Sequence, residues 1–231
     1  MAEKRRVFIA GGTGYLGRPL IADLLQRGHE LRALVRDGSR GKLPPGCTAI
    51  VGDALDATSY AGQISPSDTF VQLVGVAHPS PAKGAQFRSV DLASASGAIR
   101  AAAEAGVKHF VYLSVAHPAP MMKAYIEVRS ECERMIRQSG MNATILRPWY
   151  VLGPGHRWPC ALIPMYWLME RFPVTREGAL RLGLVTLAQM KGALLSAVEN
   201  PPLGIRVVEV PQIRAALSPQ PALPFPNISA L

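Results

Sequence analysis

The sequence predicts an α/β protein with a doubly wound parallel β-sheet and helices on both of its faces. Two patterns in the 231 residues support this prediction. Short runs rich in β-branched and aromatic residues alternate with longer segments in which apolar residues have helical spacing. Glycines close most of the helical segments, as is common at helix C-termini. Strands and helices that alternate in this way pair in parallel, because each right-handed crossover returns the chain to the same edge of the sheet.

The first half of the chain predicts four strands and two helices. The strands are expected at 5–10, 31–35, 47–51 and 69–74, and the helices at 15–27 and 86–105. The second half continues the alternation with strands at 109–113, 143–146 and 205–210, and helices at 123–138 and 186–199. Thr186 is the expected N-cap of the last helix, because its hydroxyl can accept from a backbone N–H in the first turn.

The pattern changes after Pro148. We expect one domain over 1–231, in which about 149–217 forms a small C-terminal substrate lobe and 218–231 forms a proline-rich, extended tail. The apolar stretch from Trp158 to Phe172 has three interpretations: a lid over an apolar substrate, a contact surface for a protein or membrane, or ordinary core. Core is the default for apolar residues at helical spacing.

Composition excludes several classes of protein. Hydrophobic residues make up 48% of the chain and charged residues 18%, which is typical of a protein with a large core. The net charge of +9 is dispersed rather than gathered in a nucleic-acid motif, so no nucleic-acid partner is expected, and peripheral contact with a membrane is the less favoured alternative. No apolar run reaches the ~18 residues of a spanning helix. The start of the chain does not resemble a signal peptide, and the three scattered cysteines are typical of the cytoplasm. No residues have metal-ligand spacing.

A glycine-rich turn at 7–17, with the sequence VFIAGGTGYLG, carries the strongest functional signal. Gly11 and Gly12 let the backbone turn sharply after the first strand. Gly14 has no side chain that would block a pyrophosphate, and Gly17 lets the following helix pack closely on the strand. Unpaired N–H groups and the helix dipole favour negative charge at this point. The strand–turn–helix context therefore predicts a dinucleotide cofactor.

The end of the second strand predicts which dinucleotide binds. In this type of fold it lies beside the adenosine ribose, where Arg36 would pair with a 2′-phosphate. Arg40 and Lys42 would add positive charge. The sequence thus favours NADP over NAD. Two alternatives stay open: Asp37 would suit the ribose hydroxyls of NAD, and Arg36 could be a solvated surface residue.

Polar and small residues also follow the third and fourth predicted strands. Gly52 and Asp53 follow the third strand, and Gly75 follows the fourth. Asp53 would accept from the adenine amino group, and Gly75 would let the ribose or the phosphates approach the backbone. Each of these signals is weak alone, because glycine after a strand is common in loops.

Taken together, several segments resemble the short-chain dehydrogenase/reductase superfamily, in its atypical and extended NAD(P)H-binding branches, which include epimerase-like proteins and nitrogen-metabolite-repression regulators. The segments are GGTGYLG at 11–17, Arg36, Gly52-Asp53, AAAEAGVKHFVYLS at 101–114 and ILRPWYVLGPG at 145–155. The resemblance implies a Rossmann-like fold. It places around the pyrophosphate Gly11, Thr13, Gly14, Tyr15, Leu16 and Gly17, and near the nicotinamide Pro148, Tyr150 and Val151.

The resemblance also implies catalytic residues, with one departure. The superfamily uses a Ser or Thr after the fifth strand and a Tyr-x-x-x-Lys pair on the next helix. Here Ser114 matches the first position, and Tyr125 with Arg129 gives Tyr-x-x-x-Arg. Residues four apart share a helix face, and a nearby cation favours a phenolate, but a guanidinium cannot pass on a proton as lysine does. Two alternatives stay open: Tyr125 belongs to an apolar stripe, and Arg129 could pair with Glu133.

Two functions follow from these residues. The first is an NADP(H)-dependent oxidoreductase that acts on a small, apolar carbonyl-type substrate. Ser114 would orient the substrate oxygen, Tyr125 would exchange the proton, and Arg129 would hold the ribose. The second is a non-catalytic NADP(H)-binding sensor, regulatory subunit or assembly module. The replacement of the lysine by Arg129 and the reduced lobe favour this alternative.

Overall fold

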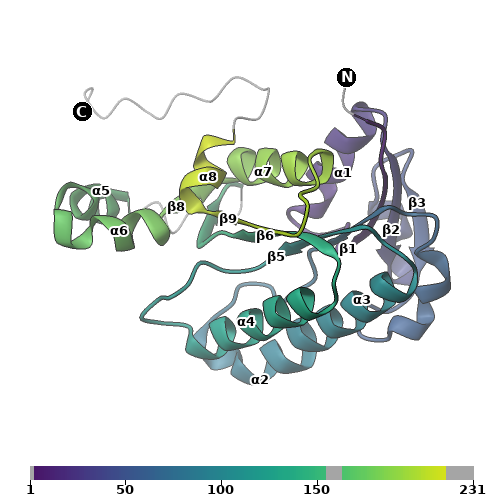
Figure 1. Cartoon of the computed structure of the whole chain (residues 1–231), viewed down its shortest axis with the longest axis horizontal. Helices are drawn as coiled ribbons and strands as arrows, with labels where there is room; N and C mark the ends of the chain where they lie inside the picture. The colour runs from purple at the N-terminus through teal and green to yellow at the C-terminus, as the bar shows by residue number, and fades with distance from the viewer. Residues whose placement is uncertain (1–2, 155–162, 217–231) are drawn as a thin grey trace.

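The computed structural model describes residues 3–154 and 163–216. Its main sheet has seven strands in the order β3-β2-β1-β4-β5-β6-β9, and every pair is parallel (Figure 1). The strands are β1 Arg6–Ala10, β2 Glu30–Val35, β3 Thr48–Val51, β4 Thr69–Gln72, β5 His109–Leu113, β6 Asn142–Arg147 and β9 Ile205–Glu209. The predicted Rossmann-like fold class is thereby confirmed. The chain order reverses between β1 and β4, where ligands bind beyond the carboxyl ends of such sheets.

Helices cover both faces of this sheet. In Figure 1, α1 and α7 lie on one side, and α2, α3 and α4 on the other. The α-helices are α1 Gly17–Gln26, α2 Gly84–Gln86, α3 Ala93–Glu104, α4 Lys123–Gln138, α5 Ile163–Arg171, α6 Pro173–Arg181, α7 Leu187–Glu199 and α8 Val210–Ala215. Short 3₁₀ turns are η1 Asp37–Lys42, η2 Ala57–Ser59, η3 Ala61–Gln63 and η4 Pro81–Lys83.

The helix predicted at 86–105 is divided in the structure. A π-helical segment, η5 Phe87–Leu92, separates α2 from α3. The wider π turn changes the direction of the side chains, and both Phe87 and Asp91 are buried. The prediction of one regular helix was wrong here, because the local apolar pattern does not distinguish a π-helical turn from an α-helical one.

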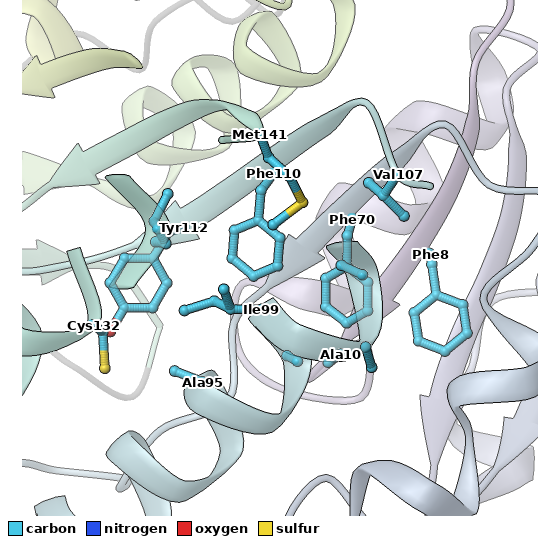
Figure 2. Packing of buried hydrophobic residues seen from close by; sticks show 14 of the residues in the cluster. Phe8, Ala10, Phe70, Ala95, Ile99, Val107, Phe110, Tyr112, Cys132 and Met141 are labelled. Carbon is cyan, nitrogen blue, oxygen red and sulfur yellow. The ribbon is translucent and has the colours of Figure 1, made fainter. Parts of the chain in front are cut away.

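A row of aromatic rings forms the core beneath α3 and α4. Phe8 of β1, Phe70 of β4 and Phe110 of β5 are direct neighbours in the sheet register. Their ring centroids are 5.1 Å and 5.3 Å apart, and Figure 2 shows the three rings side by side. The stack holds together the three central strands, whose carboxyl ends carry the candidate site.

The C-terminal lobe is built on a second, two-stranded parallel sheet that the sequence did not predict. β7 Tyr150–Leu152 pairs with β8 Leu184–Thr186. Each strand has three residues, which is too short for an alternating pattern to be recognised. Thr186 also caps α7 in a capping box with Gln189, as the prediction of an N-cap required.

The prediction that the apolar stretch up to Phe172 is core was wrong for its described part. Met165, Trp167, Leu168 and Phe172 are all exposed. α5 packs mainly against α6 at the end of the molecule opposite β3, so only one side of the helix is covered (Figure 1). Trp158 and the proline-rich tail at 218–231 lie outside the described residues.

Candidate functional site

The glycine-rich turn joins β1 to α1 in a tight loop. Gly11 has a φ of +88°, which is open to glycine, and its carbonyl oxygen accepts from the N–H of Gly14 at 3.1 Å. A Cβ on Gly17 would lie 2.7 Å from the Cα of Gly12 and closer still to the carbonyl oxygen of Gly11. The turn can therefore fold back onto the start of α1 only with glycine at 17.

This turn presents unpaired backbone donors. The N–H groups of Thr13 and Leu16 have no acceptor among the described residues, and no side chain caps the first turn of α1. Gly14 is exposed between them. Donors of this kind at a helix N-terminus suit an anion, and their spacing along the turn suits two linked phosphates. The residues present thus fit the pyrophosphate of a dinucleotide.

Tyr15 joins the turn to the C-terminal lobe. Its ring is half-buried, and its hydroxyl oxygen occupies the position that a side chain on Gly153 would take. Burial raises the pKa of the Tyr15 hydroxyl. Tyr15 therefore lies between the turn and the lobe with its hydroxyl protonated.

Arg36 stands at the end of β2 with its side chain exposed. It forms no ion pair within the described part of the chain. The neighbouring carboxylate of Asp37 instead pairs with Arg40, where Nε and Oδ1 are 3.1 Å apart. This arrangement leaves a cation, not a carboxylate, available beside the position of the adenosine ribose.

The three small or acidic residues after β3 and β4 serve the protein's own packing. A Cβ on Gly52 would lie 2.8 Å from Oγ of Ser59. The carboxylate of Asp53 accepts from the N–H of Leu55 at 2.9 Å, which closes its own loop. A Cβ on Gly75 would lie 2.5 Å from Nη2 of Arg129. These contacts account for the glycines without a ligand.

Arg129 is buried and fully engaged by the protein. Its Nη2 pairs with Oδ1 of Asp91 at 2.5 Å, and its Nη1 donates to the carbonyl oxygen of Leu113 at 2.7 Å and to the hydroxyl of Tyr112 at 3.2 Å. The alternative pairing of Arg129 with Glu133 is therefore wrong. Asp91 lies 38 residues away in the π-helical segment, and nothing in the sequence singled it out.

Burial and charge act in opposite directions on this pair. Burial is the largest effect on the Asp91 carboxyl and leaves its pKa raised, although the charge of Arg129 and the N–H of Val76 oppose that rise. Burial also opposes the charge of Arg129, but Tyr112, Tyr125 and Asp91 outweigh it and raise its pKa. Arg129 is thus a fixed cation within the site, held by a carboxylate and by carbonyl and hydroxyl oxygens.

Tyr125 lies against this cation. The Cζ atom of Arg129 is 5.0 Å from the centroid of the Tyr125 ring, and the ring of Phe87 packs on Tyr125 at 4.8 Å. The Tyr125 hydroxyl makes no hydrogen bond with the described residues, and the side chain is half-buried. The expected apolar stripe exists, but only the ring belongs to it, and the hydroxyl remains available to a ligand.

Ser114 has a partner that the sequence did not reveal. It is buried after β5, and its hydroxyl donates to Oε1 of Glu133 at 2.6 Å. Glu133 also binds Arg147 through two hydrogen bonds, and Nε2 of His117 lies 3.5 Å from the same carboxylate. Burial raises the pKa of Glu133, but Arg147 and Ser114 outweigh it, so the pKa is lowered overall. Because the Ser114 hydroxyl donates its hydrogen bond to Glu133, its oxygen offers a ligand lone pairs rather than a donor.

The segment after β6 approaches the segment after β5. The carbonyl oxygen of Pro148 accepts from the N–H of Ala116 at 2.9 Å. Trp149 and Tyr150 pack edge to face at 5.5 Å, and Tyr150 and Val151 enter β7. Pro148, Tyr150 and Val151 therefore belong to the same edge of the sheet as Ser114, as their places after neighbouring strands predict.

Comparisons with known proteins agree with this geometry. Residues 11–155 match a family model described as NAD(P)H-binding. The chain is 27% identical over 226 residues to a 3-diazoavenalumate denitrifying reductase from a Streptomyces species, covering 86% of this chain and 74% of the relative. It is 26% identical over 213 residues to a ceramide reductase from Caulobacter vibrioides, covering 90% and 65%. Several other curated relatives are matched over less than half of their own length.

Solved structures show the same fold. The crystal structure of the Bordetella bronchiseptica enzyme WbmH in complex with NAD+ superposes with a TM-score of 0.68 at 21% identity, over 90% of this chain and 76% of that one. At this identity the likeness establishes the fold alone. It places the glycine-rich turn of this chain in a fold that, in that structure, is in complex with a dinucleotide.

Proposed function

Because the chain belongs to the NAD(P)H-binding family, we propose that it is an NADP(H)-dependent oxidoreductase that acts on a small, apolar carbonyl-type substrate. One observation carries the proposal. The Tyr125 ring lies against a fixed guanidinium, and its hydroxyl makes no hydrogen bond with the described residues. Tyr125 also stands at the tyrosine position of the Tyr-x-x-x-Lys pair that the resemblance implies, with Arg129 in place of the lysine. Relatives that are named reductases support the same class of reaction.

The proposed chemistry divides between the cofactor and the chain. A bound nicotinamide would supply or accept the hydride. Tyr125 would give a proton to the substrate oxygen, or take one in the reverse direction. Arg129 places a fixed positive charge against the Tyr125 ring, with its Cζ atom 5.0 Å from the ring centroid. Arg129 acts through its charge and not as a proton relay, because a guanidinium does not deprotonate.

Ser114 and its neighbours would recognise the oxygen of the reduced substrate. The Ser114 hydroxyl donates its hydrogen bond to Glu133, so its oxygen would accept a hydrogen bond from an alcohol. Arg147 compensates the charge of Glu133 and keeps that orientation. The site therefore suits the alcohol form of a substrate better than a carbonyl at Ser114, and leaves polarisation of the carbonyl to Tyr125.

The preference for NADP rests on Arg36. Its guanidinium has no carboxylate partner within 3–154 and 163–216, whereas Asp37 is paired with Arg40. Titration of intrinsic fluorescence with NADPH and NADH tests it. Arg36→Gln is expected to weaken NADPH binding at least about tenfold and leave NADH unchanged, because only the 2′-phosphate is lost as a partner. Arg100→Gln, in an exposed position of α3, is the matched control. Equal losses for both coenzymes would refute the assignment.

Turnover is tested separately with a panel of apolar aldehydes and ketones at saturating NADPH. Tyr125→Phe is expected to lower kcat by about 100-fold or more while NADPH affinity stays unchanged, because only the proton donor is removed. Tyr60→Phe, a buried tyrosine elsewhere in the core, controls for general loss of packing. Undiminished turnover by Tyr125→Phe would exclude this mechanism.

A second candidate is a non-catalytic NADP(H)-binding sensor, regulatory subunit or assembly module. The observation that favours it is the closed hydrogen bonding of the site, in which Arg129 is held by Asp91 and Ser114 by Glu133. Neither is then available to the ribose or to a carbonyl. Tight NADPH binding by the wild-type protein without any substrate-dependent oxidation of NADPH would favour this candidate.

A further inference from the structure

The outward side of α5 is apolar where a solvated helix is normally polar. Met165, Trp167, Leu168 and Phe172, which directly follows the helix, are between 47% and 57% exposed. Pro164 is exposed beside them, and the one charged side chain on this side is Arg171. Clustered exposed apolar residues of this kind mark an interaction surface, whereas single ones do not. We call this set the α5 apolar face.

The α5 apolar face points away from the candidate site. The side of α5 that faces the body carries Tyr166, which is half-buried and lies close to Trp149. At 100° per residue, Leu168 lies about 160° around the helix from Tyr166, and Phe172 about 120°. Glu170, also on the inward side, pairs with Arg214 of α8 at 3.0 Å. These contacts turn Tyr166 toward the segment after β6 and leave the apolar residues directed outward.

The charges around this face are positive. Both carboxylates of α5 and α6 are paired, Glu170 with Arg214 and Glu177 with Arg181. Arg171 and Arg176 are exposed and have no carboxylate partner among the described residues. The guanidinium of Arg171 lies over the Trp167 ring at 4.1 Å from its centroid. A tryptophan with adjacent arginines suits the boundary between lipid headgroups and acyl chains.

We propose that the α5 apolar face docks the protein on the surface of an anionic lipid bilayer. The apolar side chains enter the boundary between headgroups and acyl chains, and Arg171 and Arg176 contact anionic headgroups. The net charge of +9 attracts the whole molecule to such a surface. The contact is peripheral, and within the described part of the chain no helix has the length and apolar character to cross a bilayer.

Co-sedimentation of the full chain with vesicles tests the proposal. The vesicles are pure phosphatidylcholine, or phosphatidylcholine with 30% phosphatidylglycerol. The wild type is expected to bind the anionic vesicles, and Leu168→Glu to weaken that binding about tenfold or more, since it removes an inserted side chain and adds a repelled charge. The matched control is Leu203→Glu, at a leucine that is 99% exposed in the loop between α7 and β9. Arg176→Gln is expected to weaken binding severalfold, and Arg100→Gln not at all.

Each other outcome overturns the proposal. No binding to anionic vesicles, or equal losses for Leu168→Glu and Leu203→Glu, would refute it. A concentration-dependent dimer in light scattering that Leu168→Glu abolishes would assign the face to a second copy of the chain. A changed KM for Leu168→Glu without lipid would assign it to the substrate. NADPH affinity is measured on the same variants, and it is expected to be unchanged, so failure here is distinct from failure of the proposed oxidoreductase activity.

Discussion

Removal of the Asp91 carboxylate tests the buried ion pair most directly. Asp91→Ala leaves the guanidinium of Arg129 without its charged partner, although both side chains are almost inaccessible to solvent. It also removes the acceptor of the Val76 N–H, at 3.0 Å. Loss of one partner of a buried pair costs about 3–5 kcal/mol, and an unsatisfied buried N–H costs about 1–3 kcal/mol more. Because the two losses overlap, we expect the free energy of unfolding to fall by about 4–5 kcal/mol.

Urea unfolding followed by tryptophan fluorescence measures this change. Asp91→Asn is the matched control, because it keeps an oxygen for the Val76 N–H and loses only the charge, for an expected loss of about 2 kcal/mol. Asp91→Ala combined with Arg129→Met removes both charges and is expected to recover most of the stability. A loss below about 1 kcal/mol for Asp91→Ala would show that Arg129 does not depend on Asp91 for its charge.

Three further predictions test other parts of the fold by urea unfolding, and one of them also by NADPH binding. Burial lowers the pKa of His109 to about 4, whereas a histidine in the unfolded chain has a pKa near 6.5. The unfolded state therefore binds the proton first as the pH falls, and the free energy of unfolding is expected to drop by about 3 kcal/mol between about pH 6.5 and 4. The same dependence of stability on pH in His109→Gln as in the wild type would contradict this. Gly17→Ala is expected to lower the free energy of unfolding by more than about 2 kcal/mol and to abolish NADPH binding, because its methyl group overlaps Gly11. Gly38→Ala is the control, and it is expected to cost little because the space around Gly38 is open. Equal losses of stability in the two variants would exclude a steric cause. Phe70→Ala is expected to lower the free energy of unfolding by about 3–5 kcal/mol, and Phe70→Leu by less than about 1.5 kcal/mol. An unchanged stability of Phe70→Ala would mean that the aromatic row is not needed for stability.

The elements of the sheet could be predicted because each carries a local signal. β5 and α4 have the predicted bounds, and β9 begins where its run of branched residues begins. Thr186 was recognisable as a cap from its place before an apolar helix. The three-residue strands β7 and β8 carry no such signal, since their pairing joins segments more than thirty residues apart.

Partners within the site were beyond the reach of sequence spacing. The four-residue spacing on α4 suggested that Arg129 pairs with Glu133, but the two side chains find partners on different elements, Asp91 and Arg147. A long-range pair of this kind depends on the whole fold. The exposure of Trp167 was missed for a related reason, because apolar residues at helical spacing do not reveal whether another element covers them.

The place of Arg129 beneath Gly75 ties three positions of the chain to one another in evolution. A side chain at position 75 would overlap the guanidinium of Arg129, and a neutral residue at position 91 would leave its charge without a carboxylate partner. A short residue at position 129 would leave a void under the end of β4. A substitution at any one of positions 75, 91 and 129 therefore disturbs the contacts of the other two. In an alignment of relatives, these three positions would change together or not at all.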